Sequence, residues 1–97
     1  MNAEERTVTI HNRIKNRMID AGIRHYDWDA GNGGWSIDAY DNRSVCIAMG
    51  PGDSYPFIFI DEVADKETLE KIQVVINLVL TVMEEVTDQE EAESKNK

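Results

Sequence analysis

The single cysteine and the two histidines are the first residues to consider for catalysis. Nucleophilic catalysis needs a thiol or hydroxyl beside a base, with a third group that orients the base. Cys46 lies between Val45 and Ile47 in an apolar run, which is typical of an inert core cysteine. His11 falls in a helical pattern and His25 in a strand-like one, and neither adjoins a turn of small residues that would hold a site open. We therefore expect that the chain is not an enzyme.

Residues 27–33 (DWDAGNG) partly match the start of a calcium-binding loop. The EF-hand pattern requires oxygen ligands at positions 1, 3 and 5, glycine at position 6 and glutamate at position 12. Counted from Asp27, the carboxylates of Asp27 and Asp29 fit, but Gly31 takes position 5 and Asp38 takes position 12. The flanking segments also read as strands rather than helices. A polar hairpin is therefore favoured over a calcium site.

Zinc and phosphate sites have weaker support in the sequence. The one cysteine and two histidines, at positions 11, 25 and 46, lack the spacing of zinc ligands. Gly50 and Gly52 are not followed by the lysine and helix of a phosphate-binding loop. We expect no metal and no cofactor.

Aromatic and acidic side chains are concentrated in the segments 26–29 and 35–41. Aromatic side chains are enriched at binding hot spots, and carboxylates beside them suit arginine or lysine on a partner. The alternative is that both tryptophans, Trp28 and Trp35, fill the core while the aspartates solvate a hairpin. The candidate partner-binding residues, with one acid from the glycine-rich turn, are Tyr26, Asp27, Trp28, Asp29, Asp38, Tyr40, Asp41 and Asp53.

The charge of the chain is strongly negative and unevenly distributed. The net charge is −9, from 19 acidic and 10 basic residues. Residues 1–24 carry a net charge of +2, and residues 25–97 carry −11. This balance argues against direct nucleic-acid binding, which depends on lysine and arginine, and favours a partner protein with a basic surface. The other reading is that the acidity only keeps a small protein soluble.

Hydrophobic periodicity and turn signals predict one α+β domain over residues 1–86, of order α-β-β-β-β-α. Asn2 with Glu5 forms a capping box for a first helix over 3–21, and Gly22 supplies its left-handed end. Four short strands joined by tight turns predict an antiparallel meander. The strands are expected at residues 23–28, 35–40, 44–49 and 55–60, and a disordered acidic tail at 87–97.

Alternation along the strands predicts one covered face of the sheet, against which both helices pack. The residues expected to share that face are Trp35, Ile37, Val45, Ile47, Phe57 and Phe59.

The segment 69–86 predicts a long helix that is apolar over most of its circumference. Its main apolar row is Leu69, Ile76, Val79 and further residues at the same spacing, so we expect cover on at least two sides. The sheet supplies one side. The first helix or a second copy of the chain supplies the other, which makes a homodimer through this helix possible.

The longest run without a charged residue here, 72–83, is too short for a membrane span. A single cysteine excludes an internal disulfide, and with no signal-peptide pattern at the N-terminus we expect a cytoplasmic protein.

These features together suggest a small acidic binding protein without catalytic activity. In size, acidity and the lack of a catalytic constellation the chain resembles phage-encoded anti-defence proteins such as anti-CRISPR proteins. That resemblance implies an inhibitor whose carboxylates stand in for phosphates on a nucleic-acid-binding surface, a DNA mimic. The alternative is a dimeric chaperone, or an immunity or antitoxin-type protein, that binds a cognate protein; small acidic chaperones of secretion systems are similar in charge and layout.

Overall fold

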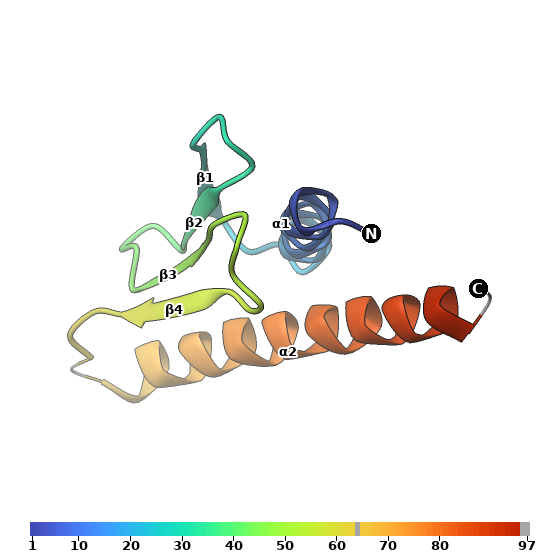
Figure 1. The fold of residues 1–97 in the computed structure, drawn as a ribbon. Coiled ribbons are helices and arrows are strands. Elements are labelled where there is room, and N and C mark those ends of the chain that lie inside the picture. The colour runs from blue at the N-terminus through green and yellow to red at the C-terminus, as the bar shows by residue number, and fades with distance from the viewer. Residues whose placement is uncertain (64, 96–97) are drawn as a thin grey trace.

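A computed structural model of the chain describes residues 1–63 and 65–95. A first helix is followed by four strands and a long second helix (Figure 1). The order α-β-β-β-β-α and the α+β class are as predicted. The bounds are α1 Ala3–Asp20, β1 His25–Asp29, β2 Trp35–Ala39, β3 Val45–Met49, β4 Phe57–Ile60 and α2 Lys66–Lys95.

The ends of α1 are fixed by local hydrogen bonds, as the sequence predicts. The Asn2 side chain accepts a hydrogen bond from the Glu5 amide at 2.8 Å and donates one to the Glu5 carboxylate at 2.7 Å. At the other end Gly22 has φ +68°, and the Ile23 amide donates to the Met18 carbonyl at 2.9 Å. This is a Schellman motif, which turns Ile23 back onto the helix and buries it. Because Ile23 belongs to this cap, β1 begins two residues later than predicted, at His25.

The four strands form one antiparallel sheet in the order β1-β2-β3-β4. Both helices lie on the same side of it, with α2 running along β4 and α1 nearer to β1 and β2 (Figure 1). Buried side chains of α1, β2, β3 and α2 make a single core. The centre of that core is the aliphatic row of β2 and β3, Ile37 opposite Ile47, both fully buried.

The register of β4 corrects one prediction. Val45 pairs with Ile60 and Ile47 pairs with Ile58, so the isoleucines of β4 share the face of the buried β3 residues. Phe57 and Phe59 therefore point to the opposite face and are exposed, although the alternation predicts them in the core. Every residue of β4 is apolar, so the sequence alone does not show whether the isoleucines or the phenylalanines face the helices.

The acidic C-terminal segment also differs from the prediction. Residues 87–95 continue α2 instead of forming a disordered tail, and residues 96–97 lie outside the described part. Basic side chains of α1 and the N-terminal amine hold these last turns. Arg6 pairs with Glu90 at 3.1 Å, the N-terminal amine pairs with Glu93 at 3.2 Å, and Arg17 pairs with Glu85 one turn before the segment. The excess positive charge of residues 1–24 thus forms ion pairs with acidic residues within the fold.

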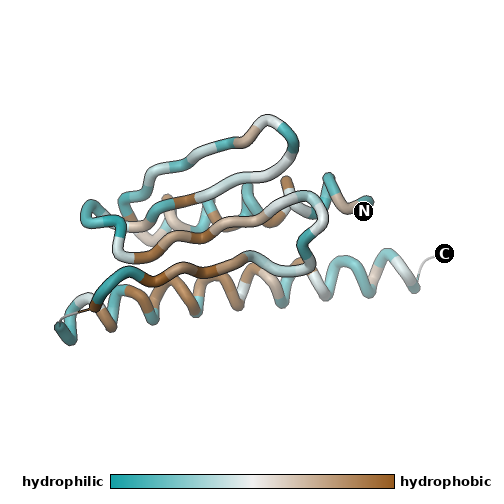
Figure 2. Tube along the Cα trace, turned by 60° about the vertical axis from the view of Figure 1, so that its left-hand side comes forward, coloured by the Kyte–Doolittle hydropathy of each residue, from teal (hydrophilic) through white to brown (hydrophobic). Residues whose placement is uncertain are grey.

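The long helix α2 is covered on one side only. Its buried stripe is Ile72, Val75, Val79, Val82, Met83 and Val86. Leu69 and Ile76, predicted to be in the main buried row, are instead exposed, together with Val74 and Leu80. Figure 2 shows the hydrophobic stretches of β4 and α2 side by side, while the last turns of α2 are hydrophilic. Among the described residues no helix has the length and apolarity to cross a membrane.

Candidate functional site: the open face of the sheet

The face of the sheet that is turned away from both helices is the strongest candidate site, and we call it the open face. The strand register places its side chains in two rows that cross all four strands. The first row is Trp28, Ser36, Ala48 and Phe57; the second is Tyr26, Asp38, Cys46 and Phe59. Each row has an aromatic residue at both ends and small or polar residues between them. The open face is therefore a trough with aromatic walls.

The aromatic residues of both walls are exposed, and the two on β4 lie close to each other. Trp28 is 65% exposed and Phe59 is 59% exposed, and the rings of Phe57 and Phe59 lie 6.4 Å apart. A hollow of about 320 Å³ lies between Trp28 and the two phenylalanines, over Ser36 and Ala48. A contiguous exposed aromatic surface of this kind marks an interaction site more often than a random surface does.

The loop between β1 and β2 and the loop between β3 and β4 close one end of the hollow. Each loop is held in shape by a hydrogen bond from a glycine amide to an aspartate. Asp29 accepts a hydrogen bond from the Gly31 amide at 2.7 Å, in the loop between β1 and β2. Asp53 accepts one from the Gly50 amide at 2.8 Å, in the loop between β3 and β4. Asp53 thus lines the hollow with one carboxylate oxygen engaged. Asp29 instead lies opposite the buried Trp35, so the alternation of β1 turns its side chain to the side of the sheet that faces the helices.

Three predicted residues lie on the open face itself, and a fourth lies beside it. Tyr26, Trp28 and Asp38 belong to the two rows, with Tyr26 directly opposite Asp38. The Tyr26 hydroxyl donates to Asp41 at 3.4 Å. The Arg43 guanidinium lies 4.6 Å from the centre of the Tyr26 ring, so this end of the trough already holds a cation over an aromatic ring.

The structure also places the last two predicted residues, Asp27 and Tyr40, away from the open face. Asp27 points to α1, where it contacts His11 and Lys15. Tyr40, with φ +69°, donates its hydroxyl to the Lys71 carbonyl at 2.8 Å and so ties the sheet to α2. Burial raises the pKa of the Tyr40 phenol. Both residues stabilise the fold and are not available to a partner.

Phe57 and Phe59 are the functional candidates that the sequence pattern misses. The residue types of the sheet contain a pattern that could have placed the two phenylalanines on the open face. The covered face is aliphatic at its centre, with Ile37 and Ile47, and the isoleucines of β4 match it. The phenylalanines match the aromatic residues of β1 on the other face.

The thiol on the open face is poorly suited to nucleophilic chemistry. Burial raises the pKa of Cys46 to about 11, helped by a hydrogen bond to the Asp38 carboxylate and by its negative charge. A thiol with this pKa is almost entirely protonated at neutral pH, and the protonated form is a weak nucleophile. In the part of the chain that the structure describes, no three metal-binding side chains are grouped where they could hold an ion.

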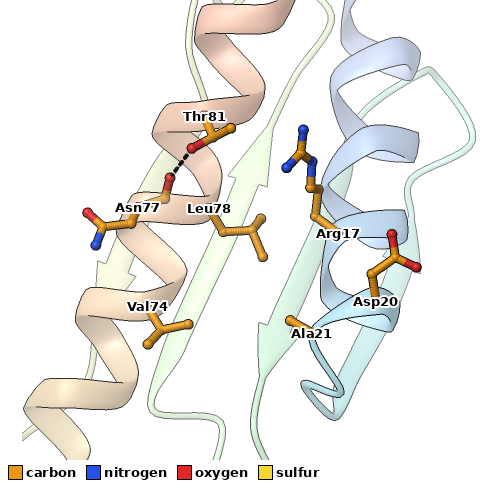
Figure 3. Close-up of a pocket in the computed structure, with 7 residues that line it drawn as sticks. All are labelled: Arg17, Asp20, Ala21, Val74, Asn77, Leu78 and Thr81. Atoms are coloured by element: carbon orange, nitrogen blue, oxygen red, sulfur yellow. Dashed lines mark hydrogen bonds between the residues drawn. The ribbon is translucent and has the colours of Figure 1, made fainter.

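A second concavity, of about 480 Å³, lies between the C-terminal end of α1 and the middle of α2 (Figure 3). Val74 and Leu78 project into it from α2, while Arg17 of α1 and Ala21, the C-cap residue of that helix, line the other side. Arg17 is engaged with Glu85 across the helices. This cleft offers an apolar wall and, besides Arg17, a single charged side chain, Asp20, so it specifies a ligand less well than the open face does.

Comparisons with protein-family models, with curated proteins and with solved structures gave no match.

Proposed function

We propose that this chain is a small, non-enzymatic binding protein that docks its open face on a basic surface of a partner protein. The observation that carries the proposal is the exposure of three aromatic rings, Trp28, Phe57 and Phe59, around one hollow. Burying such rings against a partner removes a large apolar area from water. An inhibitor of a nucleic-acid-binding protein, such as a cytoplasmic phage anti-defence protein, is the form of this function that the size and acidity favour.

The charges around the trough support a basic partner. Within the described residues Asp38 and Asp53 form no ion pair, whereas Asp41 pairs with Arg24 at 3.0 Å. Two carboxylates without an ion pair stand next to the exposed rings. Complementary charges raise the association rate and fix the orientation of a complex, and a basic nucleic-acid-binding surface supplies the matching lysines and arginines.

The test is a comparison of captured partners. Immobilised wild-type protein and the double variant Trp28→Ala, Phe57→Ala are exposed to a lysate of the source organism, and bound proteins are identified by mass spectrometry. The matched control is Ile19→Ala, which removes an exposed apolar side chain from α1. A partner retained by the wild type and the control but lost with the double variant supports the proposal. Equal capture by all three proteins contradicts it.

Salt dependence tests the electrostatic part. Affinity for the captured partner is expected to fall as ionic strength rises from 50 to 500 mM, because exposed charges are screened. The partner's nucleic acid should compete with the protein. Affinity that does not change with salt would remove charge mimicry from the proposal while leaving the aromatic contact in place.

A dimeric chaperone or antitoxin-type protein is the second candidate, and one observation favours it. The outer row of α2, Leu69, Ile76 and Leu80, is apolar and uncovered in the single chain. Sedimentation at tens of micromolar separates the candidates: a dimer that Leu80→Asp dissociates favours the second, and a monomer favours the first.

A further inference from the structure

The open face has a shape that selects the kind of segment able to occupy it. The backbone groups of β2 and β3 are already paired with both neighbouring strands. A segment lying over these strands therefore finds no backbone partner and must satisfy its own N–H and C=O groups, which a helix does. We propose that the open face receives a basic amphipathic helix of the partner protein, as a third layer on the sheet. This inference rests on the proposed function and specifies the partner's docking element.

The dimensions fit a helix. Four strands span three inter-strand spacings, about 14 Å from β1 to β4. A helix with its side chains is about 10–12 Å wide. Ser36 and Ala48 on the floor let it approach closely, and Trp28 and Phe57 stand on either side.

The spacing of the rows sets the pattern of the occupant. The two rows are two residues apart along each strand, about 6.8 Å, and residues four apart on a helix are about 6 Å apart. When an apolar side chain of the partner's helix lies over Ala48, the side chain four residues away on that helix therefore lies over the row that contains Asp38. That second side chain is a lysine or arginine, because Asp38 is the acidic group of the row.

Charge argues against a second copy of this chain as the occupant. Packing two open faces together brings Asp38 and Asp53 of each copy towards one another, which opposes association. An extended segment is disfavoured too, since it would pair its backbone with the free edge of β1 or β4 instead of covering the face.

The experiment selects peptides from a random 20-residue display library on the wild-type protein, with counter-selection on Ala48→Arg. The Ala48→Arg variant fills the floor of the trough with a cation. Its circular dichroism and melting temperature are compared with the wild type, and Ser36→Arg is the second variant if Ala48→Arg does not fold. Enriched peptides are expected to carry lysine or arginine three or four residues from a large apolar residue.

Synthetic versions of the enriched peptides are then measured in solution. They are expected to gain helicity on binding and to shift the fluorescence of Trp28; Trp35, the other tryptophan, is buried and should not respond. Asp38→Asn is expected to weaken binding about 10-fold. Asp20→Asn, which removes an exposed carboxylate of α1 from another surface, should change it less than about twofold.

Four results would overturn the inference. They are failure to enrich any peptide, enrichment of alternating sequences that stay extended, equal binding to Ala48→Arg, and self-association of the protein that Ala48→Arg abolishes. If Trp28→Ala, Phe57→Ala still removes a captured partner in such a case, the proposed function stands and only the helical occupant is rejected.

Discussion

His11 Nε2 lies 2.6 Å from Asp27 Oδ1, and this contact joins the middle of α1 to the sheet strand β1. The imidazole also stacks flat on the Trp35 ring, with centroids 4.8 Å apart. Trp35 in turn donates its indole N–H to the Thr7 carbonyl at 3.1 Å. A carboxylate, an imidazole and an indole thus fix the angle at which α1 crosses the sheet. These contacts lie on the side of the sheet opposite the open face, and they hold the sheet against α1 there.

The first prediction concerns acid stability. Burial on its own raises the pKa of the Asp27 carboxyl, but the hydrogen bond and charge of His11, with Lys15, bring it below its usual value of 3.8. A carboxyl with a depressed pKa in the folded state stabilises the protein above its unfolded pKa, and the contribution is lost as pH falls through the folded value. Asp27→Asn is expected to lower the free energy of unfolding by about 1 kcal/mol at pH 6.

Urea unfolding of wild type and Asp27→Asn at pH 6, 4 and 3 checks this sign. The difference between the two proteins should shrink below pH 4. A difference that stays constant from pH 6 to 3 would show that Asp27 does not act through its ionised form.

The second prediction concerns the end of α1. Gly22 has φ +68°, and a Cβ built there meets no atom within 4 Å. Replacement by alanine therefore costs only backbone strain, about 1 kcal/mol. Gly22→Asn should cost less, since asparagine tolerates this conformation better. Chemical denaturation measures both; equal stabilities for Gly22→Ala and the wild type would contradict the left-handed cap.

Interactions between neighbouring residues explain why some elements can be predicted from the sequence. Asn2 with Glu5 and Gly22 with Ile23 act on neighbouring atoms, so the residue types alone define the two ends of α1. The turns between the strands are local in the same way. The meander follows from them because short turns force neighbouring strands to pair.

The features that could not be predicted from the sequence depend on packing between residues far apart in the chain. In β4 both alternating sets are apolar, and only its pairing with β3 puts Phe59 opposite Cys46 on the open face. In α2 the apolar arc is wider than the sheet can cover, so the pattern does not identify Ile76 as exposed. The end of α2 depends on Arg6 reaching Glu90, 84 residues away in the chain. Aromatic and acidic residues indicate a binding surface, but register and partners select which of them face it.

The third prediction separates the covered and uncovered sides of α2. Val75 is fully buried, whereas Leu80 is 56% exposed. An unpaired carboxylate at position 75 is expected to cost at least about 3 kcal/mol, because it is buried without a cation. Leu80→Asp is expected to stay within about 0.5 kcal/mol of the wild type, as for most surface substitutions.

Thermal melting and light scattering are measured on both variants. Val75→Asp should unfold at markedly lower temperature. A large loss of stability in Leu80→Asp, with a lower mass than the wild type, would mean that a second chain covers the outer row of α2 in solution.

The last prediction concerns the thiol of the open face. Because the pKa of Cys46 is raised from 9.0 to about 11, the thiolate at pH 8 should be about 100-fold rarer than in an unperturbed thiol, and alkylation by iodoacetamide should be slower by a similar factor. Burial also slows reaction by limiting access, so the native rate alone does not isolate the electrostatic cause. Asp38→Asn does, since it removes the neighbouring charge and leaves the side-chain size unchanged. The pH at which alkylation accelerates should move downward in Asp38→Asn and should stay where it is in Asp20→Asn. An unchanged profile in Asp38→Asn would show that this carboxylate does not face Cys46, and the charge assigned to the middle of the trough would then be misplaced.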